Sequence, residues 1–388
     1  MAKADVVRPL SSEEDVDAWA AFCASCFADK KPTPPSQAFF RAHYDLDPHR
    51  GAGARSRMLV AAAGAEAGAD ILSSVCVYRR ELCVGGAVVV MGGVGDVCTA
   101  VAARGRGLCK RAVLAALGVM ARQDTRLSAL HAGPHVAPMY AALGWRSASL
   151  KWRPVALLRP PPAAQGAGGG GAGAVREASP ADAADAAALA ALHRPYALRF
   201  NGPVARDAQY WSRWVAGQLG ADRYWVLADA ADDADDDADA AGSPSRLRAL
   251  LCIQNYRGAL KVRDFAACPE DVAADGGAAA FAQLARHALV VPPLASGAAA
   301  EPTVFVPAPI AAEFAAGGGE AVAGMRVAPA GAEGETEDLG WMYRAIAPAA
   351  EEGAAAAAAE SEGGALLSRL LAGEQAGRPH LVFPIDHF

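Results

Sequence analysis

Long apolar runs, a secretory signal and a basic surface are all missing from this sequence of 388 residues. No run of 18 apolar residues is free of charges or breaks, so we expect no membrane span. The N-terminal MAKADVVRPLSSEED is acidic and has no apolar core, so we expect no secretory signal. The net charge of −6 and the lack of a basic stripe interleaved with aromatic residues argue against nucleic acid as the main partner.

Cysteines at metal-binding spacing are also missing. The chain has eight cysteines, and its one CxxC, Cys23 and Cys26, lies in a helix-like run with no second pair at zinc spacing. We therefore expect packed, reduced thiols, no metal and a cytoplasmic location. The acidic run at 229–241 lacks the glycine spacing of an EF-hand and favours a solvated loop over a calcium site.

The stretch Val97–Trp145 is the most informative part of the chain. Its pattern predicts a strand, a glycine turn, a helix, a second strand and a short helix that carries a tyrosine. The turn at 104–107, Arg-Gly-Arg-Gly, opens a helix rich in Ala, Leu and Val, expected over Leu108–Ala121. N–H groups at a helix start lack partners and carry the positive end of the helix dipole, so they are suited to bind phosphate.

The side chains of this turn fit the same role. Gly105 and Gly107 allow the backbone to approach a phosphate without an intervening Cβ. Arg104 and Arg106 supply positive charge that suits the oxygens of a diphosphate. The turn therefore predicts a pyrophosphate site at the start of the helix.

At these residues the sequence resembles the GCN5-related N-acetyltransferase (GNAT) superfamily, whose cofactor motif is Arg/Gln-x-x-Gly-x-Gly/Ala. Arg104, Gly107 and Cys109 occupy its three fixed positions, with the small Cys109 in place of Gly or Ala. The second signature of the family, Tyr-x-x-x-Gly-aromatic, is matched by Tyr140, Gly144 and Trp145.

The resemblance implies an α/β (α+β) fold, with a mixed, mostly antiparallel central sheet that is splayed at its fourth strand. It also implies acetyl-CoA as co-substrate, with its carbonyl held by an N–H of that strand. Glycines at 92, 93 and 95 are consistent with a bulge that opens the strand. The residues expected to bind the co-substrate are Val97, Cys98, Thr99, Arg104, Gly105, Arg106, Gly107, Leu108, Cys109, Lys110, His135 and Val136.

The chemistry requires a group that takes a proton from the amine and an acid for the leaving thiolate. Tyr140 matches the family tyrosine that faces the coenzyme A sulfur, so it is the expected acid. Asp96, near the position where many members keep an acidic group, and His131, at the end of the fifth strand, are candidate bases. A third candidate is the terminal carboxylate of Phe388, because enhanced-intracellular-survival (Eis) type acetyltransferases end in a phenylalanine that reaches the active site.

The length and a restart of the pattern predict more than one domain. A GNAT domain is expected over 1–158, ending in a strand at Trp145–Leu158, and a Pro/Gly linker over 159–174. A similar order of elements without the glycine turn predicts a second, degenerate GNAT-like domain over 175–310, with an unrelated α+β domain as the alternative. Residues 311–388 are expected to be a C-terminal segment that returns toward the active site.

The leading prediction is an acetyl-CoA-dependent N-acetyltransferase whose primary amine substrate attacks the thioester directly. The alternatives are a GNAT enzyme acting on free lysine or another small amine, and a non-catalytic acyl-CoA-binding or interaction protein. A dinucleotide-binding oxidoreductase would need Gly-x-Gly-x-x-Gly after the first strand, where the sequence does not have it. The sequence is compatible with a homo-oligomer. Trp211, Trp214 and Trp225 are expected to fill a core rather than to line the acceptor pocket.

Overall fold

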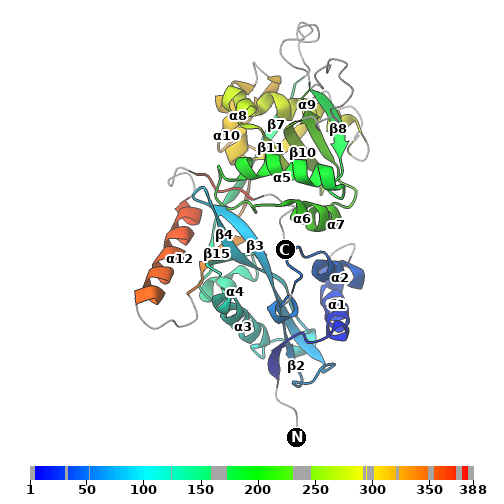
Figure 1. Ribbon diagram of the computed structural model, residues 1–388, viewed down its shortest axis with the longest axis vertical. Helices are drawn as coiled ribbons and strands as arrows, with labels where there is room; N and C mark the ends of the chain where they lie inside the picture. The colour runs from blue at the N-terminus through cyan, green and yellow to red at the C-terminus, as the bar shows by residue number, and fades with distance from the viewer. Residues whose placement is uncertain are drawn as a thin grey trace, which may run out of the picture. The chain divides into compact units, whose positions relative to one another are not determined.

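The chain folds into two units (Figure 1), seen in a computed structural model. The first unit comprises Met1–Ala148 and Leu339–Ala376, and the second Ser149–Asp338 and Gly377–His387. The expected linker and acidic run lie almost entirely outside the described residues, and Phe388 lies outside them as well. The structure describes residues 5–30, 34–51, 53–123, 125–158, 173–229, 246–291, 294, 301–319, 323–347, 354–372 and 378–382.

The first unit is built on a sheet in the order β1-β2-β3-β4-β5-β15-β6. Neighbouring strands are antiparallel except for the parallel pair β4 and β5. This mixed, mostly antiparallel sheet is the one that the GNAT resemblance implies. The strands are β1 (Val6–Pro9), β2 (Met58–Ala62), β3 (Ile71–Val84), β4 (Ala87–Thr99), β5 (Leu127–His131), β6 (Arg146–Ser147) and β15 (Trp341–Ala345).

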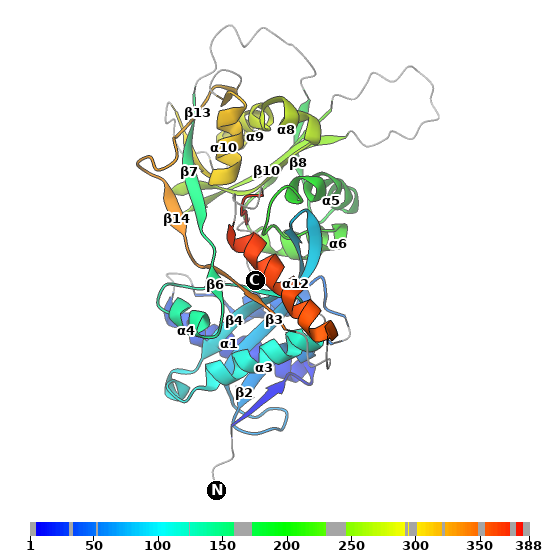
Figure 2. The same ribbon diagram turned by 90° about the vertical axis from the view of Figure 1, so that its left-hand side faces the viewer.

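Helices cover both faces of this sheet (Figures 1 and 2). Side chains alternate along β3, so that Cys76 and Tyr78 pack under α1 and α2, whereas Val75 and Val77 pack under α3 and α4. Ser12 caps α1 and Ser36 caps α2, each by accepting a backbone N–H bond three residues on. The helices are α1 (Glu13–Phe27), α2 (Gln37–Asp45), α3 (Leu108–Arg122), α4 (Ala137–Ala142) and α12 (Ala354–Ala372), with 3-10 turns η1 (Ala28–Lys30), η2 (Arg55–Arg57) and η3 (Val101–Ala103).

The strand expected at Trp145–Leu158 is divided between the two units. Its start forms β6, whereas β7 (Leu150–Leu157) pairs with strands of the second sheet. The edge of β5 is instead covered by β15, from the C-terminal part of the chain. The boundary therefore lies after Ala148 rather than at 158, because an apolar pattern predicts a strand but does not select its partner.

The second unit has the sheet order β13-β7-β12-β11-β10-β9-β8, with β14 on β7. As in the first unit, four antiparallel strands are followed by a helix and by a strand, β12, that runs parallel to its neighbour β11. The second unit is thus a second GNAT-like domain. Its strands are β8 (Ala174–Ala178), β9 (Tyr224–Ala228), β10 (Leu247–Tyr256), β11 (Ala259–Ala267), β12 (Thr303–Pro307), β13 (Met325–Val327) and β14 (Thr336–Asp338).

The core of the second unit contains a buried ion pair of Arg206 with Asp264, whose carboxylate also accepts a 2.7 Å bond from Tyr224 Oη. Trp211 and Trp214, on a π-helical turn, are fully buried, as expected for core residues. No helix in the described part of the chain is long and apolar enough to cross a membrane. The helices are α5 (Ala183–Ala197), α6 (Ala208–Tyr210), η5 (Trp211–Val215), α7 (Ala216–Gln218), α8 (Pro269–Asp275), α9 (Ala278–Val290) and α10 (Ala308–Ala316).

Candidate active site

Strand β4 leaves its parallel neighbour after a short contact. Only Met91–Gly93 pairs with β5, and among the described residues the rest of β4 pairs with β3 alone. Helix α3 lies close to this point, because a Cβ on Gly92 would stand 2.8 Å from Met120 Sδ. Gly92 therefore lets the helix approach the strand where the sheet opens.

The bulge in β4 lies beyond the glycines that were expected to form it. Ser74 pairs with Cys98 and Cys76 with Gly95, so β4 has one more residue than β3 in this interval. Asp96 accommodates the extra residue with a φ of +48°, in the left-handed region. Aspartate is one of the few residues other than glycine that adopts this region readily.

The bulge changes which face of the sheet each side chain meets. Val94 and Val97 both pack into the cluster under α3, although residues three apart on a regular strand point to opposite faces. Asp96 and Cys98 face α1 and α2 instead, where the Cys98 thiol lies 3.7 Å from that of Cys23. The cysteines of the chain, including the CxxC pair, are free thiols.

The Asp96 carboxylate is bound by two side chains. His43 Nδ1, on α2, lies 3.0 Å and 3.2 Å from its two oxygens, and Tyr78, on β3, donates its phenolic O–H to Oδ2. The side chains of His43 and Asp96 are 9% and 7% exposed. Burial and the charge of Asp96 hold the pKa of Tyr78 well above its usual value, so the phenol stays a donor. Sequence reasoning missed His43 and Tyr78, since neither lies in a recognisable motif.

The glycine turn before α3 leaves the helix start open. Gly105 and Gly107 have φ values of +76° and +74°, and among the described residues no atom beyond their chain neighbours lies within 4 Å of a Cβ built on either of them. The first turn of α3 closes with Arg111 N–H donating to Gly107 O, and no side chain in the described part of the chain caps the helix. The N–H groups ahead of that bond and the space around the glycines fit a diphosphate.

The charged side chains of the turn are placed differently from one another. Arg104 is exposed, with Nε 3.4 Å from Thr99 O, whereas Arg106 forms an ion pair with Asp5. Arg104 is therefore exposed beside the turn, whereas Arg106 is bound to the segment before β1. Lys110 is exposed on the first turn of α3.

Tyr140 lies on α4 in the cluster that joins α4 to β4 and α3. It is 5% exposed, its ring meets Trp145 edge to face at 5.9 Å, and Val97 and Cys109 pack into the same cluster. Burial, with a smaller effect from Cys109, raises the pKa of Tyr140. The tyrosine is therefore held as a neutral phenol next to the opened strand.

The remaining expected residues are spread around this region. His135 is exposed and Val136 packs at the start of α4. His131 is exposed at the end of β5, with its ring 5.3 Å from that of Trp341 on β15. Thr99 Oγ1 lies 2.9 Å from Ser73 Oγ.

The second unit differs at its corresponding helix start. Gly277, before α9, has the same left-handed conformation as Gly107. Here, however, the buried carboxylate of Asp275 accepts 2.9 Å bonds from the N–H groups of Gly277 and Ala279. A side-chain anion thus takes two N–H donors at this helix start, in contrast to the start of α3.

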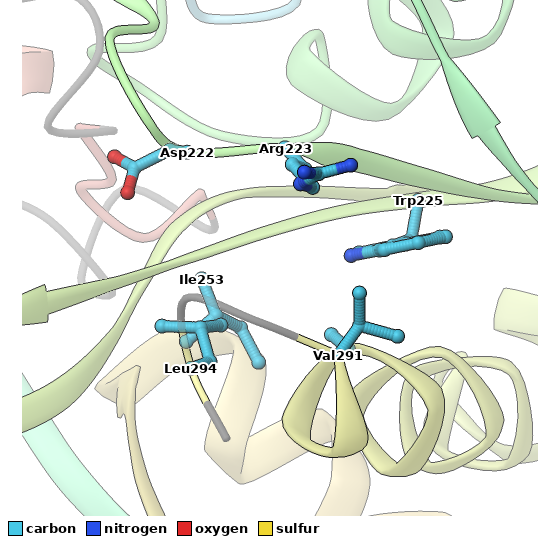
Figure 3. A pocket seen from close by; sticks show the side chains of 7 residues that line it. Asp222, Arg223, Trp225, Ile253, Val291 and Leu294 are labelled. Carbon is cyan, nitrogen blue, oxygen red and sulfur yellow. The ribbon is translucent and has the colours of Figure 1, made fainter. Parts of the chain in front are cut away.

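Two cavities lie away from these residues. One, in the second unit beside Trp225, holds about 10 Å³, roughly the space of one water molecule (Figure 3). The other, about 330 Å³, lies in the first unit between β1, β2 and the later turns of α3. Neither is lined by the glycine turn, Asp96 or Tyr140, and Trp225 walls a space too small for an acceptor.

Part of the chain matches a known protein family. Residues 6–148 match a family described as "Acetyltransferase (GNAT) domain". No curated protein sequence matches the chain.

Solved structures of similar fold include a probable N-acyltransferase from Enterococcus faecalis V583, with 13% identity, a TM-score of 0.56, and coverage of 89% of this chain and 73% of that one. A GCN5-related N-acetyltransferase from Kribbella flavida has 18% identity, a TM-score of 0.54, and coverage of 88% and 72%. Eis1 from Mycobacterium abscessus has 16% identity, a TM-score of 0.52, and coverage of 89% and 74%. The expected GNAT fold and its structural likeness to Eis are confirmed, and residues 6–148 of this chain match the GNAT acetyltransferase domain family.

Proposed function

We propose that this chain transfers an acetyl group from acetyl-CoA to a primary amine, which attacks the thioester directly in a ternary complex. The observation that carries the proposal is the bulge of β4, which directs Val97 to the face that holds Tyr140 and Asp96 to the opposite face. A proton donor and a proton acceptor then flank one open strand.

The donor thioester would lie along this opened edge. The uncapped start of α3, Gly105, Gly107 and the exposed Arg104 would hold the diphosphate. Backbone N–H groups of the segment Val97–Thr99 would bind the acetyl carbonyl and stabilise the oxyanion that forms on attack. Lys110, His135 and Val136 stand at the adjoining helix starts and would contact the rest of the co-substrate.

The acceptor nitrogen loses two protons in the reaction, and the leaving thiolate gains one. The acceptor is an ammonium at neutral pH, since free amines have pKa values near ~10, so it must lose a proton before it attacks. Formation of the C–N bond and cleavage of the C–S bond then leave a thiolate, to which Tyr140 donates its phenolic proton, and the new amide nitrogen returns a proton to the phenolate. The proton acceptor is sought among Asp96 with its neighbours and the terminal carboxylate of Phe388.

The test measures thiol release from acetyl-CoA with a panel of amines that includes free lysine, polyamines and aminoglycosides. Amine-dependent release, with thermal stabilisation by acetyl-CoA and none by NAD, is expected. Stabilisation by acetyl-CoA without release for any amine would favour a non-catalytic acyl-CoA-binding protein instead. Stabilisation by NAD alone would refute the assignment.

A matched pair of glycine variants tests the donor site. Gly107→Ala and Gly258→Ala both place a Cβ in open space at a positive φ, at +74° and +86°. Their backbone strain is similar, but Gly258 lies in the β10–β11 turn of the second unit. We expect only Gly107→Ala to raise the KM for acetyl-CoA, by about tenfold or more, because only there does the Cβ meet the phosphate.

A further inference from the structure

The group that takes the proton from the amine can be sought among the side chains that meet at the bulge. Asp96 is the acidic group there, but its carboxylate already accepts bonds from His43 Nδ1 and from the Tyr78 hydroxyl. The Asp96 oxygens are thus already engaged by neighbouring side chains. An isolated aspartate is therefore a poor description of this site.

The histidine in this cluster is better suited to the proton transfer. Contact of Nδ1 with both oxygens of Asp96 places the ring proton on Nδ1, so the basic lone pair lies on Nε2. A carboxylate that orients an imidazole in this way also stabilises the imidazolium that forms. Imidazole is also the side chain that most often serves as a general base in enzymes.

The imidazole is 9% exposed and lies on the side of β4 opposite Tyr140. Phe39, one turn earlier on α2, is 42% exposed, and its ring contacts that of His43 at 4.5 Å. Tyr140 packs in the cluster on the α3 side. An amine that approached β4 from the α2 side would meet His43, while the thioester sulfur would face Tyr140.

We propose that His43 is the base that deprotonates the acceptor amine, with Asp96 and Tyr78 as the residues that position it. The proposal rests on the proposed function and deepens it. The ammonium gives one proton to Nε2, the neutral amine attacks the carbonyl carbon, and the C–S bond breaks. Tyr140 gives its proton to the sulfur and regains one from the new amide nitrogen, and the imidazolium releases its proton to water.

The charged and titratable groups around the cluster define its electrostatic surroundings. Asp47 forms an ion pair with the buried Arg80. The Arg80 guanidinium in turn lies 5.4 Å from the ring of Tyr78. The groups around the cluster are Cys23 on α1, Cys76, Tyr78 and Arg80 on β3, Asp96 and Cys98 on β4, and Asp47 after α2.

The experiment compares kcat against pH for the full-length protein and its variants. His43→Gln is expected to lower kcat by about 10²–10⁴-fold and to remove the acid limb of the profile, with the KM for acetyl-CoA unchanged. The matched control is His287→Gln, because His287 is a partly buried histidine in the second unit, against Trp225, and its loss should leave kcat unchanged.

Tyr78→Phe gives a second measurement that does not depend on the tolerance of position 43. Loss of the hydroxyl leaves the Asp96 carboxylate less stabilised, so the carboxylate favours the imidazolium more strongly. Because the base must be unprotonated, the acid limb of kcat should move to higher pH, which a purely structural role of Tyr78 would not cause. Asp96→Asn should lower kcat as His43→Gln does.

Three results would overturn the proposal. The first is a His43→Gln variant that keeps kcat and its pH profile within about twofold of the wild type. The second is an unmoved acid limb in Tyr78→Phe, together with loss of turnover on adding one alanine after Phe388, which would assign the base to the terminal carboxylate. The third is a wild-type enzyme that releases no thiol with any amine, which refutes the proposed function itself and is thereby distinguished from the first two.

Discussion

Replacement of Gly92 with alanine probes the point at which β4 separates from β5. A Cβ built there stands 2.8 Å from Sδ, 2.9 Å from Cγ and 3.2 Å from Cε of Met120, which is fully buried on α3. Contacts this short require the methionine or the helix to move. The substitution therefore strains the packing of α3 on the strand without changing any polar group.

The size of the effect follows from two opposing terms. Overpacking of a core by one carbon costs about 1–3 kcal/mol in the free energy of unfolding, and the flexibility of methionine favours the lower part of that range. Replacement of glycine by alanine in a strand returns roughly 0.5–1 kcal/mol of backbone entropy. We expect Gly92→Ala to destabilise the first unit by about 1 kcal/mol.

A double-mutant cycle with Met120→Ala isolates this contact. Met120→Ala by itself should cost about 2–5 kcal/mol, because it leaves a cavity in a buried cluster. With the methionine removed, Gly92→Ala should cost nothing or be slightly stabilising. Because the chain has two units, the measurement is hydrogen exchange of peptides from α3 and β4 in low urea. An equal cost of Gly92→Ala in both backgrounds would refute the reasoning.

Three further predictions concern acid catalysis, pH and the second unit. Tyr140→Phe should lower kcat by about 10²-fold or more while the KM for acetyl-CoA stays within about twofold, and full turnover would remove Tyr140 as the acid. Hydrogen bonds from Arg8 and Ser11 lower the pKa of the buried Asp15, so its contribution to stability is present above about pH 4 and is lost as the pH falls through the lower folded value. Asp15→Asn should therefore lower the melting temperature at pH 7 and flatten its acid dependence. Asp275→Ala should destabilise the second unit by about 1 kcal/mol in urea melts, and a changed KM for acetyl-CoA would contradict the role assigned to Asp275.

The parts of the first unit that sequence reasoning predicted are those set by local pattern. A capping serine starts α1, a glycine turn starts α3, and apolar runs form the strands between them. Each depends on residues within a few positions of one another, so the printed sequence contains the whole cause. The fold class and the place of Tyr140 follow from the same kind of signal.

The strand that completes the first sheet has no such signal. Strand β15 pairs with β5 over Leu127–His131, some 200 residues earlier in the chain, and Gly340 lies so near His131 that a Cβ there would stand 2.6 Å from its Nε2. The pattern of β15 is typical of any buried strand. Only the free edge of β5, left when β7 pairs in the other sheet, decides where it goes.

The sequence alone did not reveal all residues of the candidate site, for a related reason. One extra residue at Asp96 shifts the side-chain alternation of β4, so that Val97 joins Tyr140 while Asp96 meets His43. The glycines nearby are the conventional sign of a bulge, yet the positive φ falls on the aspartate that binds the histidine. If the two faces serve the two proton transfers, the bulge itself separates acid from base, and its position must be known before either role can be assigned.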